Sequence, residues 1–136
     1  MPHTPRTPSE QEVLVAAHAI VDAFRTTNTE RYFAGFAPDA SFIFHPEPSR
    51  LNTRAEYEKL WASWLAGGWR VIACDSSEPL VQVFPGGAVF SHTVHTTVFT
   101  GEAEDSYWER ESIIFRIEGD GLVGVHEHLS AFTSEG

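Results

Sequence analysis

The sequence contains only one cysteine, Cys74, which excludes a disulfide framework and suits a reducing cytoplasm. Basic residues are also scarce: nine Lys and Arg stand against 19 Asp and Glu, which gives a formal net charge of −10. A surface of that charge repels nucleic-acid phosphates and anionic membranes, so we expect neither as a partner. No apolar run approaches the ~20 residues of a membrane span, and the Pro- and Thr-rich start lacks the apolar segment of a signal peptide. We therefore expect a cytoplasmic protein.

The chain is long enough for one domain and leaves little room for a second. Its 136 residues are 42% hydrophobic, which is sufficient for a core that needs no disulfide or metal. Pro2, Pro5 and Pro8 predict a flexible N-terminal arm over residues 1–8. We expect a single domain over residues 9–133 and a short C-terminal tail over residues 134–136.

Three helices are predicted in the first half of the chain. Ser9 with Glu12, and Thr53 with Glu56, have the spacing of a capping box, the motif that begins a helix. Apolar residues recur at helical spacing from the first box to about residue 26, and from the second box to the glycine pair that ends that helix. Aromatic residues one turn apart predict a short helix between them, over residues 29–36.

The second half of the chain has the period of β-strands. After a first strand over residues 40–45, four longer segments cover residues 69–84, 87–100, 106–118 and 122–132. Pro79 predicts a bend or bulge within the first of these four. Connections as short as these imply an antiparallel meander, and helices followed by a meander predict an α+β fold with the helices on one face of the sheet.

Alternation along the strands divides their polar residues between two faces. In the last two strands the odd positions are mostly apolar, for example Ile113, Phe115, Val123, Val125 and Leu129, so the odd face is expected to pack on the helices. On that covered face, in a cavity or at its mouth, we place His92, Glu109, Glu111 and Glu127. On the opposite face we place His95, Arg110, Ser112, His126, His128 and Ser130, with Phe99 and Trp108 beside them. A single β-bulge would exchange the two groups.

Each group suggests its own chemistry. His92 with Glu111 or Glu127 would provide a general base and a group that orients it; alternatively the glutamates lie in water at the rim and His92 only bonds the backbone. Arg110, His126 and His128 would hold a carboxylate if their face lines a pocket, or fix a dimer if it faces a second subunit, which the apolar pattern favours. His126 and His128 alone do not complete a zinc site, so we expect no metal and no cofactor. The third helix supplies aromatic residues that are either core or the wall of a ligand pocket: Tyr57, Trp61 and Trp64.

Residues 110–130, which read RESIIFRIEGDGLVGVHEHLS, resemble the C-terminal signature of SnoaL-like members of the nuclear transport factor 2-like superfamily. The order of the helices and the first strand fits as well, and the last strand is similar to that of the calcium/calmodulin-dependent kinase II association domain. One departure is Leu122, where a tryptophan is common. The resemblance implies a cone-shaped, strongly bent, mostly antiparallel six-stranded sheet packed on three N-terminal helices, a cystatin-like roll with a pocket in the cone. It also implies a homodimer formed by sheet faces.

The resemblance leaves the reaction open, because the superfamily contains both enzymes and binding domains. Our first hypothesis is a domain that binds a small organic molecule in the cone pocket, including the case of an isomerase, cyclase or dehydratase that uses His and Glu for acid–base catalysis. The alternative is a non-catalytic ligand-binding or homo-oligomeric assembly module.

Overall fold

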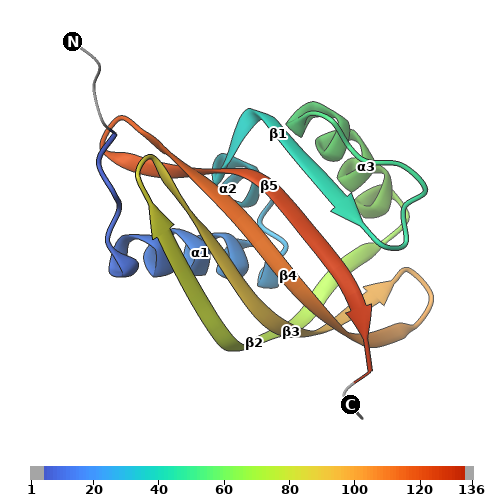
Figure 1. Cartoon of the computed structure of the whole chain (residues 1–136). Coiled ribbons are helices and arrows are strands. Elements are labelled where there is room, and N and C mark those ends of the chain that lie inside the picture. The colour runs from blue at the N-terminus through green and yellow to red at the C-terminus, as the bar shows by residue number, and fades with distance from the viewer. Residues whose placement is uncertain (1–4, 134–136) are drawn as a thin grey trace.

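The computed structural model describes residues 5–133 (Figure 1). Three helices and five strands follow one another as α1 (Glu10–Arg25), α2 (Thr29–Ala34), β1 (Phe36–Phe44), α3 (Arg54–Ala66), β2 (Trp69–Phe84), β3 (Gly87–Thr100), β4 (Glu104–Glu118) and β5 (Gly121–Phe132). The predicted α+β class and the order of elements are confirmed. No helix in the described part of the chain combines the length and the apolar character that crossing a membrane requires.

Both predicted helix starts are present, with one difference between them. At α1 the Ser9 side chain accepts from the Glu12 amide, and the Glu12 carboxylate accepts from the Ser9 amide, so the capping box is complete. At α3 the Thr53 side chain accepts from the Glu56 amide, but the Glu56 carboxylate bonds the amide of Asn52 instead. Each cap satisfies amide groups that have no partner within the helix.

The sheet has the strand order β1-β5-β4-β3-β2. β1 pairs with β5 in parallel, and all other neighbours are antiparallel. In a flat sheet the two edge strands would lie roughly 19 Å apart. Helix α3 nevertheless packs against both edge strands, β1 and β2, so the sheet bends around the helices. The mostly antiparallel cone is confirmed, with five strands in residues 5–133 where six were expected.

One strand prediction needs correction and another is confirmed. The short helix ends at Ala34 and β1 begins at Phe36, earlier than the predicted start of the strand. Pro38 is tolerated in β1 because it lies between Phe36 and Ser41, where the pairing with β5 is interrupted. The segment Trp69–Phe84 stays one strand: at the predicted bulge near Pro79 the pairing with β3 shifts register and then resumes.

A β-bulge in β5 changes which residues face the helices. Ile114 pairs with His126, but Phe115 pairs with Gly124, so Val125 is the extra residue. Beyond the bulge Leu122 packs against the core and Gly124 is buried, whereas Val123 and Val125 were predicted there. Gly124 lies so close to Phe36 that an added Cβ would come within 2.7 Å of its ring. Along β5, the alternation therefore predicts correctly which residues face the helices only after Val125.

An aromatic core fills the space between the sheet and the helices. Its fully buried members come from both layers: Tyr32, Phe36, Phe42, Trp61, Phe90 and Phe115. The Trp61 ring stacks on Tyr32 with 5.0 Å between centroids, and its Nε1 donates to Thr29 Oγ1 over 2.8 Å. Because the buried indole N–H has a partner, Trp61 is a satisfied core residue.

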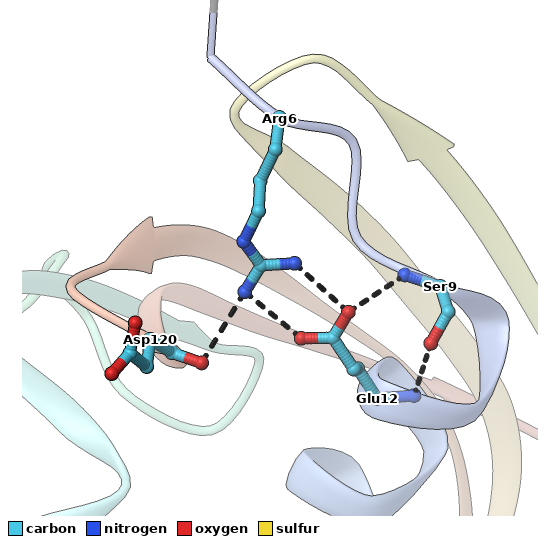
Figure 2. Close-up of polar contacts among 4 residues, drawn as sticks. All are labelled: Arg6, Ser9, Glu12 and Asp120. Atoms are coloured by element: carbon cyan, nitrogen blue, oxygen red, sulfur yellow. Dashed lines mark hydrogen bonds and ion pairs between the residues drawn. The ribbon is translucent and has the colours of Figure 1, made fainter.

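The described part of the predicted N-terminal arm, residues 5–8, docks on the domain (Figure 2). The Arg6 guanidinium donates twice to the Glu12 carboxylate, at 2.9 and 3.0 Å, and once to the carbonyl oxygen of Asp120. The Gly86 amide donates to the Arg6 carbonyl over 2.9 Å. The segment thus joins α1, the β2–β3 turn and the β4–β5 turn. Residues 1–4 and the predicted tail, residues 134–136, lie outside the described residues.

Candidate ligand cavity and its carboxyl groups

A cavity of about 280 Å³ lies between the sheet and the helices. Its volume is close to the lower end of the range of ligand sites in proteins. Most of its wall is apolar or aromatic, with a few polar groups among the rings, the composition that is typical of such sites. The lining residues that matter most below are Phe24, Tyr32, Tyr57, Trp64, Trp69, Tyr107, Glu109, Glu111 and Glu127.

Three glutamates reach the cavity from the sheet. Glu109 and Glu111 are two residues apart on β4 and therefore share a face, and Glu127 lies on β5, where it pairs with Ile113. Their exposed fractions are only 8%, 8% and 3%. The predicted placement of these residues on the covered face is confirmed. Buried carboxyl groups are costly unless they are hydrogen-bonded or protonated, so their partners decide what they can do.

Glu111 is held from behind by a histidine. The Nε2 atom of His92, the residue opposite it on β3, lies 2.6 Å from Glu111 Oε1. The other ring nitrogen, Nδ1, lies 2.5 Å from Ser76 Oγ on the exposed edge strand β2. The His92 side chain has no exposed surface and burial lowers its pKa to about 4, so the ring is neutral near neutral pH. His92 does not line the cavity; it contacts Glu111 from the layer behind.

Glu127 is held by two tyrosines from the helices. The hydroxyl of Tyr32 on α2 donates to Glu127 Oε1 over 2.9 Å. The hydroxyl of Tyr57 on α3 lies 2.9 Å from that of Tyr32, and since the Tyr32 proton is already used, Tyr57 is the donor. Burial raises the pKa of both phenols well above their ordinary value, so both are neutral donors.

Glu111 and Glu127 influence each other's protonation. Burial, the charge of Glu111 and a hydrogen bond with Glu111 raise the pKa of Glu127 well above its ordinary value. Burial raises the pKa of Glu111 as well, but the hydrogen bond with Glu127 acts in the opposite direction. Two interacting carboxyl groups of this kind share one proton. Near neutral pH we therefore describe Glu127 as the acid and Glu111 as the carboxylate, which accepts from the Nε2–H of His92.

Glu109 has a different partner. Its Oε2 lies 2.6 Å from Nε2 of His45, the residue that follows β1. Burial raises the pKa of Glu109, while the hydrogen bond with His45 lowers it. The side chain of His45 is 34% exposed, so Glu109 is hydrogen-bonded to a residue that reaches solvent.

The structure separates the other predicted site residues. Tyr57 and Trp64 line the cavity, whereas Trp61 lies in the core behind them. Arg110, His126 and His128 lie on the outer face of the sheet, away from the cavity glutamates. They are partly or fully exposed there, on the face where the sequence pattern places them.

The outer-face residues are less closely grouped than expected. Arg110 pairs with Ser130, and not with His128, which lies opposite Ser112. The Arg110 guanidinium instead stands over the Phe132 ring, 4.2 Å from its centre. His126 Nδ1 lies 2.9 Å from the hydroxyl of Ser41. The tight turn between the strands predicts Arg110 opposite His128; the bulge at Val125 moves its partner by one residue, from Leu129 to Ser130, and the turn at Glu118 and Gly121 accounts for the other residue.

Two functional groups could not be found from sequence as parts of a site. Tyr32 has the pattern of a core residue of a short helix, and His45 that of the end of a strand; only the tertiary fold brings them to Glu127 and Glu109. The one available signal is that a buried tyrosine hydroxyl requires a partner. Within residues 5–133 no group of three or more His, Cys, Asp or Glu side chains is arranged to hold a metal ion.

Several solved structures share this fold. A ketosteroid isomerase-like protein from Erwinia carotovora atroseptica superposes with a TM-score of 0.76 at 16% identity, covering 90% of this chain and 95% of that one. A Streptomyces avermitilis protein of the nuclear transport factor 2-like family, provisionally named a dehydratase, gives 0.70 at 16%, with 91% and 97% covered. An Exiguobacterium sibiricum protein, provisionally named a Ca/calmodulin-dependent kinase II association domain, gives 0.77 at 15%, with 93% and 96% covered. At these identities the likeness concerns the fold alone.

The sequence comparisons are more specific. No curated protein matches this sequence. A sequence model of the SnoaL-like domain matches residues 13–134, nearly the whole chain. This match covers all three helices and all five strands except the first turn of α1. The chain therefore belongs to the SnoaL-like domain family.

Proposed function

We propose that this domain binds a small organic molecule in the cavity and catalyses proton transfer on it, as in an isomerisation or a dehydration. The observation that carries the proposal is the pair Glu111 and Glu127, two buried carboxyl groups in an aromatic cavity with different hydrogen-bond partners. Pairs whose surroundings separate their pKa values are typical of acid–base sites. The fold shared with a ketosteroid isomerase-like protein and a provisionally named dehydratase is compatible with this class of reaction.

The hydrogen bonds assign a role to each group. Glu111, as the carboxylate, is the general base that removes a proton from carbon; its pKa is raised, which brings it closer to the pH at which a base works best. Glu127, as the acid, donates a proton to the oxygen that gains charge, and Tyr32 and Tyr57 support it as donors. His92 is a positioning residue, because it touches Glu111 and not the cavity.

Exchange of protons with solvent tests this reaction class without knowledge of the natural substrate. A panel of small cyclic and aryl ketones is incubated with the protein in D₂O, and loss of the α-proton signal is followed by ¹H NMR. We expect accelerated exchange for at least one member. The acceleration should fall by about 100-fold or more in Glu111→Gln and in Glu127→Gln. Glu102→Gln, at an exposed turn, is the matched control and should keep full activity. Absence of exchange across the panel, or an active Glu111→Gln, would refute proton transfer.

A second candidate function, an assembly module, is favoured by the outer face of the sheet. Trp108 stacks on His95 at 4.5 Å and packs edge-on against Phe132, next to Arg110. Aromatic and Arg side chains on an exposed face are typical of interfaces, so we propose a homodimer through this face. Arg110→Ala should then weaken the dimer in sedimentation equilibrium and leave ligand binding intact. A variant that stays dimeric but no longer binds ligand would show that this face is not the interface.

A further inference from the structure

The side chains in the cavity wall that can carry a full charge near neutral pH are all glutamates. Glu109, Glu111 and Glu127 come from the sheet, and Glu47 comes from the loop after β1. Among the described lining residues there is no Lys, Arg or His. A ligand that carries a carboxylate or a phosphate would therefore meet like charge without a counter-ion, which is unfavourable in a buried site.

Aromatic rings line the same cavity as these carboxyl groups. Trp64 and Trp69 lie 5.2 Å apart by ring centroids, and Phe24 lies 6.2 Å from Trp69. Tyr107 lines the same cavity from β4. The faces of aromatic rings attract cations, most strongly where water is excluded. Rings and carboxyl groups together offer an organic cation both contacts that it needs.

We propose that the ligand of this cavity is a small organic cation, a ring that carries an ammonium group on a short chain. The inference rests on the proposed function because it assigns the same cavity, and it narrows the substrate to one charge class. The size follows from the volume: an apolar cavity of about 150 Å³ holds benzene, so 280 Å³ holds one ring with a side chain. The ammonium group would pair with Glu109, which leaves the proton of Glu127 in place for the reaction, and the ring would pack on Trp64 and Trp69.

A cation in this cavity has a consequence for protons. Burial raises the pKa of Glu109, so this carboxyl group holds a proton more readily than an exposed glutamate does when the cavity is empty. The titratable groups that face Glu109 are His45 after β1, Tyr107 and Glu111 on β4, and Glu127 on β5. An ammonium group nearby favours the ionised carboxylates. Binding of an ammonium compound is therefore expected to release protons, whereas binding of its neutral analogue is not.

Three probes of nearly equal shape test the charge class directly: 2-phenylethylamine, 2-phenylethanol and 3-phenylpropionate. Tryptophan fluorescence measures binding, because Trp64 and Trp69 line the cavity. Calorimetry in phosphate and in Tris, whose ionisation enthalpies differ, measures proton release. We expect the amine to bind at least about tenfold more tightly than the alcohol, the acid to bind least, and only the amine to release protons.

A pair of variants assigns the preference to the carboxyl groups. Glu109→Gln should reduce the affinity for the amine about fivefold or more and leave that for the alcohol unchanged, which also shows that the variant is folded. Glu102→Gln should change neither. Equal or tighter binding of the alcohol or of the acid, or binding of none of the three, would overturn the cationic ligand. The ketone exchange assay is independent of this charge preference, so proton transfer on a neutral substrate would survive that result.

Discussion

The hydroxyl chain from Tyr57 through Tyr32 to Glu127 can be tested by removing single oxygen atoms. Tyr32 is 1% exposed and its hydroxyl makes two hydrogen bonds, one as donor and one as acceptor. Tyr32→Phe removes both and leaves two buried groups without a partner, Glu127 Oε1 and the Tyr57 hydroxyl. A buried group that loses its partner costs about 1–3 kcal/mol. We expect Tyr32→Phe to lower the free energy of unfolding by about 2 kcal/mol.

Tyr57→Phe removes only the first hydroxyl of the hydrogen-bonded series Tyr57–Tyr32–Glu127. The bond from Tyr32 to Glu127 remains, so we expect a loss of about 1 kcal/mol. In the double variant there is no orphaned Tyr57 hydroxyl, and the total loss should stay close to that of Tyr32→Phe alone. The two changes are thus non-additive by about 1 kcal/mol, as is usual for residues in one network.

Urea unfolding followed by tryptophan fluorescence gives these differences, provided that the slope of the unfolding free energy against urea is unchanged. Tyr107→Phe is the matched control, since it removes a hydroxyl from the same cavity that is not part of the hydrogen-bonded series Tyr57–Tyr32–Glu127. Additive losses, or a larger loss in Tyr57→Phe than in Tyr32→Phe, would refute the order of donors and acceptors described here.

Three further predictions concern other parts of the molecule. The pKa of buried His92 is about 4, below its ordinary 6.5, so the unfolded chain binds this proton at a higher pH than the folded protein does. The free energy of unfolding should therefore be higher by about 3 kcal/mol above pH 6.5, and this stability is lost as the pH falls through 4. Ring NMR shifts should show a neutral imidazole down to pH 5, and a titration near 6.5 would contradict this. Gly124→Ala should cost about 1–3 kcal/mol in urea unfolding, because the new Cβ meets Phe36, and a neutral effect would mean that the ring moves freely. Arg6→Ala should speed hydrogen exchange at the Gly86 amide, which bonds the Arg6 carbonyl; unchanged exchange would show that the side chain does not hold the segment.

Much of the fold was predictable because its signals are local. The capping residues Ser9 and Thr53 begin helices as predicted, and the change from helical to strand period at Trp69 marks the start of the long strands. The bulge near Pro79 follows from the missing amide proton. The signal for the bulge at Val125 is Gly124, a glycine inside a strand, but it does not give the position of the extra residue; the alternation was continued through it, and the faces before it were exchanged as a result.

The site was predictable only in part. Alternation placed Glu111, Glu127 and His92 on the covered face, as the structure confirms. It did not distinguish a residue that lines a cavity from one that lies behind it, so His92 was expected in the pocket beside a glutamate, whereas it contacts Glu111 from behind the cavity wall. The partner Tyr32 lies 95 residues from Glu127 in sequence, and only the packing of α2 on the sheet brings the two together.

The most direct test of the account is the protonation state of the paired carboxyl groups. Protein labelled with ¹³C at the glutamate side-chain carboxyl is titrated by NMR, with Glu111→Gln and Glu127→Gln for assignment. We predict one carboxyl signal that stays at the protonated position at neutral pH, that belongs to Glu127, and that moves toward ordinary behaviour when Glu111 is replaced. If every glutamate titrates within about one unit of 4.3, the pair shares no proton and the acid–base site proposed here does not exist.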